Sequence, residues 1–181
     1  MKRLLLVLLV AIIAFPAFQS CKKGENDPAL SLASRNARIT AEWKLTGIEG
    51  TRTQVAGGNT VVTTAKYDGS ILTFTQGGNS VTATGTYTMT IEKWGKMSWA
   101  ETYTVGGNTD VQTATGYWEW LDSDKNKSYV MLDGGDHLFS GGLCRIDRLA
   151  TKELVIIDEG NSNDNGDTDV WSYKYTFEKQ K

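Results

Sequence analysis

The stretch "VTATGTYTMTI" at residues 81–91 alternates apolar and polar side chains with a period of two. Successive side chains of an extended chain point to opposite faces, so Tyr87, Met89 and Ile91 share one face while the intervening threonines share the other. The stretch "WSYKYTF" at residues 171–177 repeats the pattern, with its aromatic residues on one face. Both stretches are typical of β-strands that have one buried face and one face in water.

Three near copies of one turn sequence lie between such strands. They are "AGGNT" at residues 56–60, "QGGNS" at 76–80 and "VGGNT" at 105–109. Glycine readily adopts the positive φ angles that a two-residue hairpin turn requires, so the repeats predict three antiparallel hairpins. None of the gaps between the predicted strands is long enough for a crossover helix, which excludes a parallel sheet.

The alternation predicts eight to eleven strands, depending on how neighbouring segments merge. The predicted segments are residues 43–49, 52–56, 60–67, 71–76, 80–92, 98–105, 110–121, 128–133, 143–149, 153–158 and 170–178. A meander of so many strands has to cover both its apolar face and its two edges. Closure into an up-and-down barrel covers both, whereas a two-sheet sandwich covers only the face. We therefore expect an all-β fold, a closed antiparallel barrel, with the β-sandwich as the alternative.

The N-terminal segment has the pattern of a secretory signal peptide. Lys2 and Arg3 precede the apolar run from Leu4 to Phe15. Pro16 interrupts this run before it reaches the roughly 20 residues that a membrane-spanning helix needs. Removal of residues 1–20 would change the net charge of the chain from −2 to −4. We expect residues 1–20 to be cleaved off on export.

The residues around Cys21 resemble a bacterial lipobox, which reads "FQSC" in this sequence. In a lipobox a dedicated peptidase cuts before the cysteine, and the thiol receives a diacylglyceryl group. Phe18 and Gln19 depart from the residues usual in this motif. One acyl chain anchors a protein only marginally, whereas two or three hold it firmly. An acylated Cys21 would therefore attach the protein to a membrane.

Residues 21–38 are polar after the cysteine and lack a sustained period, which predicts a flexible tether. The folded barrel domain is then expected at residues 39–181. Acylation of Cys21 would leave Cys144 without an intramolecular partner. In "LCRIDRL" this cysteine shares a face with Ile146, which favours a buried thiol over an intermolecular disulfide.

Four stretches together resemble the lipocalin-like domain of lipoproteins from the Bacteroidota. They are "ITAEWKLTGIEG" at residues 39–50, "GYWEWLDSDKNKSYVML" at 116–132, "CRIDRLATKELVIID" at 144–158 and "YKYTFEK" at 173–179. The resemblance implies a small antiparallel barrel on a lipid-tethered stalk at the outer membrane, facing either side of it. It places Trp43 where lipocalins carry the tryptophan that plugs the closed barrel end, although Ala41 replaces the glycine two residues earlier. It implies no particular activity.

The composition of the chain bears on which classes of molecule it can bind. A mildly acidic chain without a basic stripe argues against nucleic acid. We expect a non-enzymatic binding module of the cell envelope that holds a small apolar molecule or a glycan. The alternative is a structural or interaction protein of the envelope, whose filled barrel offers only its outer surface to a partner protein.

Aromatic residues on one predicted strand are candidates for ligand binding. Trp118 and Trp120 share one face of this strand, and Tyr117 lies on the other. Most aromatic residues of a barrel belong to its core or wall. A solvent-exposed set would suit stacking on a sugar or docking of a partner. The pattern alone leaves open which set points inward.

The most polar segment, residues 158–169, resembles the first half of a calcium-binding loop. The candidate ligands are Asn161, Asn163, Asn165 and Asp167. Ser172 stands where the bidentate glutamate of such a loop belongs, and a solvated loop between two strands explains the composition equally well. Calcium is therefore one alternative, and no other cofactor is expected.

Catalytic patterns are sparse. His137 is the only histidine and lies near Asp133 and Asp136 in "LDGGDHLFSGG". A single histidine among glycines is more often a surface residue than a base or a ligand. There is no activated serine or cysteine pattern, phosphate-binding loop or paired zinc-ligand spacing in the sequence. We therefore expect the protein not to be an enzyme.

Overall fold

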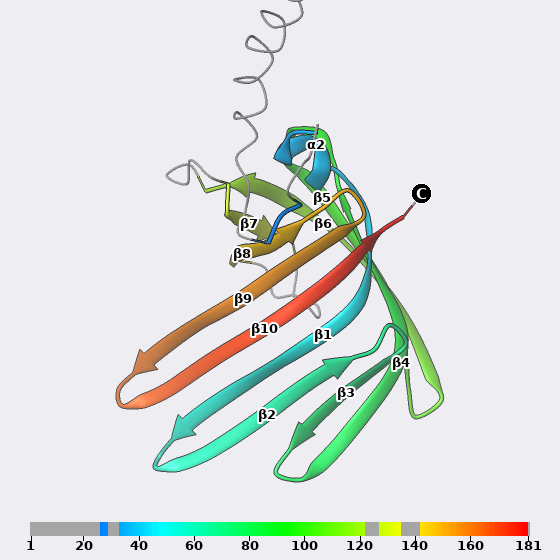
Figure 1. Cartoon of the computed structure of the whole chain (residues 1–181). Coiled ribbons are helices and arrows are strands. Elements are labelled where there is room, and N and C mark those ends of the chain that lie inside the picture. The colour runs from blue at the N-terminus through cyan, green and yellow to red at the C-terminus, as the bar shows by residue number, and fades with distance from the viewer. Residues whose placement is uncertain (1–25, 29–32, 122–126, 135–141, 181) are drawn as a thin grey trace, which may run out of the picture.

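The computed structural model describes residues 26–28, 33–121, 127–134 and 142–180, and its main feature is a closed antiparallel barrel (Figure 1). The strands are β1 (Ala41–Ala56), β2 (Asn59–Tyr67), β3 (Ile71–Gln76), β4 (Asn79–Ile91), β5 (Lys96–Val105), β6 (Asn108–Trp120), β7 (Tyr129–Asp133), β8 (Gly142–Leu149), β9 (Glu153–Asp164) and β10 (Asp167–Lys179). Two short helical segments are α2 (Arg35–Ile39) and η2 (Lys93–Gly95). Each strand pairs with the next along the chain, and β1 pairs with β10 to close the ring. The predicted all-β barrel is confirmed.

The segments predicted at residues 43–49 and 52–56 form a single strand, β1. This strand pairs with β10 from Trp43 to Val55, with one bulge near Gly47. Gly50 interrupts the apolar alternation and therefore resembles a strand end in the sequence. In the structure it lies opposite Tyr173 within the continuous ladder. The interruption is thus a close approach of backbone and ring, and the strand continues through it.

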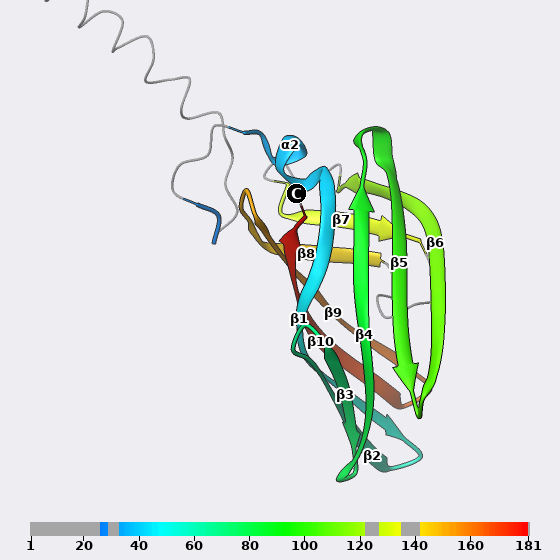
Figure 2. The same cartoon turned by 90° about the vertical axis from the view of Figure 1, so that its right-hand side faces the viewer.

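The barrel is narrow at one end and wide at the other. At the narrow end, residues 41–44 of β1 pair directly with residues 88–91 of β4. Farther along, the hairpin of β2 and β3 lies between these two strands, because β1 then pairs with β2, β2 with β3, and β3 with β4. The short strands β7 and β8 pair with each other, and they reach only the closed-end parts of their outer neighbours β6 and β9. We call the two ends the closed end, which carries α2 and η2, and the wide end, which carries the hairpin turns (Figure 2).

The glycine-rich repeats form the turns of the wide end. The pairs Gly57–Gly58, Gly77–Gly78 and Gly106–Gly107 have φ angles between 55° and 85°. Positive φ at both central residues matches the twist of the flanking strands. The three predicted hairpins are therefore confirmed, and a fourth two-residue turn, at Asn165–Gly166, joins β9 to β10.

The prediction of a loop over residues 158–169 is wrong. β9 continues to Asp164, β10 begins at Asp167, and the two strands pair without interruption. The segment is polar because this part of the hairpin extends beyond the apolar core, and residues 161–167 are exposed. A strand that is wet on both faces loses the alternation from which strands are recognised.

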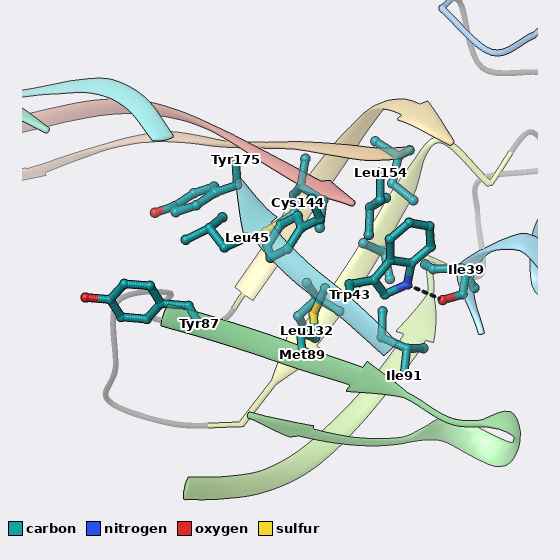
Figure 3. Close-up of a cluster of buried hydrophobic side chains, with 14 of the residues drawn as sticks. Ile39, Trp43, Leu45, Tyr87, Met89, Ile91, Leu132, Cys144, Leu154 and Tyr175 are labelled. Atoms are coloured by element: carbon teal, nitrogen blue, oxygen red, sulfur yellow. Dashed lines mark hydrogen bonds between the residues drawn. The ribbon is translucent and has the colours of Figure 1, made fainter. Parts of the chain in front are cut away.

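Apolar side chains fill the closed end (Figure 3). Trp43 lies at its centre, is 0% exposed, and donates its indole N–H to the carbonyl oxygen of Ile39 at 2.8 Å. The hydrogen bond satisfies the one polar atom of a buried ring and links β1 to the end of α2. The side chains at 0% exposure are Ile39, Trp43, Met89, Val130, Leu132, Leu149, Leu154 and Ile156. Trp43 thus closes this end of the barrel, as the resemblance implied.

Part of the segment expected to be a flexible tether packs on the closed end. Asp27 accepts a hydrogen bond from the backbone N–H of Leu149 at 2.7 Å. It also forms ion pairs with Arg35 at 3.4 Å and Arg38 at 3.2 Å, and all three side chains are at most 3% exposed. The polar composition reflects this internal pairing of charges, which composition alone does not distinguish from a solvated linker. Within the described ranges, no helix has the length and apolar character to cross a membrane.

Cys144 is buried on β8, as predicted, and burial raises its pKa to about 12. The usual thiol pKa is about 8.5, so the native state holds this proton over a range in which the unfolded chain has lost it. The resulting contribution to stability is complete below about pH 8.5 and is lost as the pH rises towards 12.

We therefore expect the thiol of a Cys21→Ser variant, in which Cys144 is the remaining cysteine, to resist a disulfide-exchange reagent at about pH 8.5. The same thiol should react fully after addition of denaturant. Following the reaction by absorbance checks this prediction. Equal rates for the folded and unfolded chain would show that Cys144 is accessible.

Candidate functional site: a cavity at the wide end

The inward-facing residues change from apolar to mixed towards the wide end, and the barrel is not filled there. A cavity of about 390 Å³ opens between β1, β2, β3, β9 and β10. Its lining residues are Ile48, Arg52, Ala65, Phe74, Asp158, Trp171, Tyr173 and Tyr175. Apolar surface with a few polar groups is the usual lining of a small-molecule site. The barrel interior thus offers a binding space at the wide end, whereas side chains fill the interior at the closed end.

Three aromatic residues of β10 form one wall of this cavity, which we call the aromatic wall: Trp171, Tyr173 and Tyr175. Residues two apart on a strand face the same way, so the three rings follow one another along the inside of the barrel. The ring centroids of Tyr173 and Tyr175 are 6.3 Å apart. The indole N–H of Trp171 donates to the carboxylate of Asp158 on β9 at 2.9 Å, which fixes the orientation of the indole.

Glycines on the neighbouring strands make room for these rings. Gly160 lies opposite Trp171, and a Cβ atom added to it would lie 2.4 Å from Cζ2 of the indole. Gly50 lies opposite Tyr173, and a Cβ there would lie 2.1 Å from Cδ1 of the phenol ring. Both rings therefore lie across the neighbouring backbone. Any larger residue at either glycine would displace the ring.

Charged groups lie beside the aromatic wall. Arg52 donates from Nε to both carboxylate oxygens of Asp169 at 3.0 Å. This hydrogen-bonded pair raises the pKa of Arg52 and lowers that of Asp169, so both groups stay charged at neutral pH. The pair is partly exposed near the wide end, where a ligand group can exchange with it.

A second cavity of about 370 Å³ lies between β3, β4, β5 and β6 and shares Phe74 with the first. Here Tyr103 donates its hydroxyl proton to Asp110 at 3.0 Å, and the amide of Gln112 donates to the same carboxylate at 2.6 Å. These hydrogen bonds lower the pKa of Asp110. Gly85 lies opposite Tyr103, which is the third pairing of a strand glycine with an aromatic residue.

Two tyrosines pack towards the closed end from these cavities. The rings of Tyr67 and Tyr87 meet edge to face with centroids 5.4 Å apart. Tyr67 donates its hydroxyl to the carbonyl of Gly85 at 2.8 Å. Burial raises the pKa of Tyr87 to about 12, so its ring stays neutral across the physiological range. The wide-end cavities therefore lie above a layer of packed, uncharged rings.

The predicted aromatic candidates lie at the closed end, where Trp118 and Trp120 line one open groove and Tyr117 lies on the opposite face of the strand. Trp118 points inward, is 8% exposed, and donates its N–H to the carbonyl of Glu92 at 2.8 Å. Trp120 packs against the core and donates to Asn36 of α2 at 2.7 Å. Tyr117 points outward and is 69% exposed. The face of this strand that carries the two tryptophans is therefore the inward face.

The predicted calcium ligands lie on the β9–β10 hairpin. Asn161 and Asn163 are strand residues, Asn165 is in the turn, and Asp167 accepts a hydrogen bond from the backbone of Gly57 at 3.1 Å. All four side chains are exposed. Among the described residues, no group of three or more His, Cys, Asp or Glu side chains is arranged to hold a metal ion. Calcium binding stays a prediction without a supporting geometry.

The remaining candidates lie at or beyond the limits of the described chain. Asp133 is exposed at the end of β7, opposite Tyr117. Its predicted neighbours Asp136 and His137 lie outside the described residues, and so does Cys21. No catalytic arrangement can be assembled from Asp133 alone.

Composition gave little indication of the wide-end site. Its aromatic wall belongs to the alternating stretch that predicts a strand, and such residues usually form a core. One signal was present for two of these glycines: Gly50 and Gly85 interrupt stretches that are otherwise well patterned, whereas Gly160 falls in the segment predicted to be a loop. A glycine inside a strand often marks a close approach of another group. Which aromatic residue lies opposite each glycine depends on the register between neighbouring strands, and the sequence does not give this register.

In comparisons with known proteins, no family model, curated protein or solved structure matches the chain significantly. The closed ten-stranded antiparallel barrel is consistent with a lipocalin-like barrel. Its function has to be inferred from the cavity itself.

Proposed function

We propose that the protein is a non-enzymatic binding module whose wide-end cavity holds a glycan. The observation that carries this proposal is the aromatic wall, in which Trp171 and Tyr173 lie across the backbone glycines of neighbouring strands. Flat aromatic faces suit the apolar face of a sugar ring, and the adjacent charged and amide groups suit its hydroxyls. The unfilled interior favours this function over that of a structural protein with a solid barrel.

The polar groups favour a glycan over a purely apolar ligand. An apolar molecule in the cavity would remove water from those donor and acceptor positions of Arg52 and Asp158 that Asp169 and Trp171 do not satisfy. Such uncompensated burial of polar groups is unfavourable by about 1–3 kcal/mol each. A hydroxyl-bearing ring can contact the same groups as donor and acceptor. Phe74 lines both cavities, so a glycan of more than one sugar unit would have to pass this residue to reach the second cavity.

The proposed location remains the surface of a membrane, reached through acylated Cys21 after removal of residues 1–20. We further propose that the protein is a lipocalin-like lipoprotein of the outer membrane. Support comes from the apolar run and the lipobox-like residues, together with the barrel. Fatty-acid labelling of expressing cells should depend on Cys21, and label retained by a Cys21→Ser variant would refute this anchor.

Ligand binding can be tested with a panel of neutral oligosaccharides and calorimetric titration of the full chain. We expect at least one oligosaccharide to bind, and Trp171→Ala to weaken its affinity by about tenfold or more, which corresponds to about 1.4 kcal/mol. Tyr117→Ala is the matched control, because this aromatic side chain is exposed on the outer face of the barrel. It should bind as the unaltered protein does.

A second variant tests whether binding needs the indole of Trp171 in its observed position or only its presence in the cavity. Gly160→Ala keeps Trp171 but would displace its indole, since the added Cβ lies 2.4 Å from Cζ2. The three nearest atoms to the added Cβ all belong to the indole side chain, so we expect affinity to fall while the backbone pairing of β9 and β10 is kept. If a long-chain fatty acid binds and no oligosaccharide does, the ligand class is wrong. If neither probe binds, the cavity is not a site for either.

A further inference from the structure

Trp94 is held in an unfavourable conformation at the closed end. It is the central residue of η2 in the turn between β4 and β5, with φ 71° and ψ 24°. Left-handed backbone costs a residue with a side chain roughly 1–2 kcal/mol, and glycine or asparagine is the usual choice there. The indole is also 95% exposed, which makes Trp94 the most exposed large apolar residue described. Packing within the barrel therefore does not explain this tryptophan.

The surroundings of Trp94 combine apolar, cationic and acidic groups, the last from Glu92 in the same turn and Glu119 in the groove beside it. Lys93 precedes it, and Lys96 follows after Gly95. An open groove of about 630 Å³ lies beside it, between α2 and the β4–β5 turn. Trp118 and Trp120 also line this groove. An exposed indole between two lysines is the combination that residues at a membrane–water interface show, because indole prefers the interface and ammonium groups meet lipid phosphates.

The chain enters the barrel at the same end. Residues 26–28 and α2 pack there, and Figure 2 shows α2 and the β4–β5 turn side by side at the end opposite the hairpin turns. The 25 residues that precede the described chain include the apolar run 4–15. A run of this kind partitions into lipid whether or not it is later replaced by acyl chains on Cys21. The inference rests on the membrane anchor proposed above, which would bring lipid close to this end of the barrel.

We propose that the closed end docks on a lipid bilayer surface, with the indole of Trp94 at the level of the headgroups and Lys93 and Lys96 beside lipid phosphates. The wide end then faces away from the bilayer. The strained turn projects the indole beyond neighbouring backbone, where it reaches the interface without unfolding of β4 or β5. This orientation is independent of which ligand, if any, the cavity holds.

The test uses the full chain and vesicles of phosphatidylcholine and phosphatidylglycerol whose acyl chains are brominated near the headgroups. Bromine quenches tryptophan fluorescence only at short range. We expect brominated vesicles to quench part of the emission relative to unbrominated ones, and Trp94→Phe to lose that quenched part. Trp171→Phe is the matched control, since its ring lies in the wide-end cavity. This variant should keep the quenching.

Three results would overturn the proposal. Equal quenching in the unaltered protein and in Trp94→Phe would show that the indole does not meet lipid. Quenching that disappears in Trp171→Phe would place the wide end on the bilayer. Absence of quenching, together with a dimer that dissociates in Trp94→Phe by analytical ultracentrifugation, would assign this surface to a second copy of the chain.

Discussion

Replacing Trp43 by alanine is expected to lower the free energy of unfolding by about 3–5 kcal/mol. The ring is fully buried among the side chains that fill the closed end, so alanine leaves a large cavity there. The substitution also removes the hydrogen bond to Ile39 that links β1 to α2. A typical domain is stable by only 5–15 kcal/mol, so the variant would be close to unfolding at physiological temperature. Urea titration followed by circular dichroism measures the change.

Trp94→Ala is the control for this substitution, because it removes the same side chain from an exposed position. Its effect on stability should be within about 0.5 kcal/mol of zero. A comparable loss in both variants would mean that the closed-end core is not what stabilises the barrel. Trp43→Phe should lie between the two, since it keeps most of the volume and loses the N–H donor.

The second large effect is expected at Asp27. Replacing it by alanine leaves Arg35 and Arg38, each 3% exposed, without the carboxylate that lies between them. Removing one partner of a buried ion pair typically destabilises a protein by about 3–5 kcal/mol. The backbone N–H of Leu149 also loses its acceptor. We expect a lower unfolding midpoint in urea and faster proteolysis near α2.

The exposed ion pair of Arg52 and Asp169 provides a control for the buried ion pairs of Asp27. Asp169→Ala breaks the pair with Arg52, whose side chain is 47% exposed. Exposed pairs contribute about 0–1 kcal/mol, so this variant should be nearly as stable as the unaltered protein. Asp27→Asn should recover part of the loss because its amide oxygen can still accept from Leu149. If Asp27→Ala and Asp169→Ala are equally stable, the segment around Asp27 is not part of the folded domain.

The strand meander could be predicted because alternation and turn chemistry agree. The threonine-rich stretch of β4 has a period of two, and the glycine repeats supply the positive φ of the hairpins, so local preference and global fold point the same way. Predictions failed where one of these signals disappears. The end of the β9–β10 hairpin is wet on both faces and reads as a loop, and Asp27 reads as part of a solvated linker.

The candidate site was harder to predict because it depends on register. Trp171 and Tyr173 are indistinguishable from core residues until Gly160 and Gly50 are seen opposite them. Conversely, Trp118 and Tyr117 are adjacent in sequence, and their opposite roles follow only from which face of β6 is inward. Alternation divides residues into two faces, and it takes the closed barrel to decide which face is the inside.

The four hairpin turns form the rim of the wide end, and the packed core of the closed end lies on the far side of the cavity from them. A Cβ atom added at any glycine of these turns would meet nothing within 4 Å, although the positive φ of the turns would still disfavour it. Lengthening a loop there costs little, since closure entropy grows slowly with length. The rim can therefore accept inserted peptides or randomised loops without disturbing the packing around Trp43. This makes the barrel a scaffold on which new recognition surfaces can be built around an unchanged wide-end cavity.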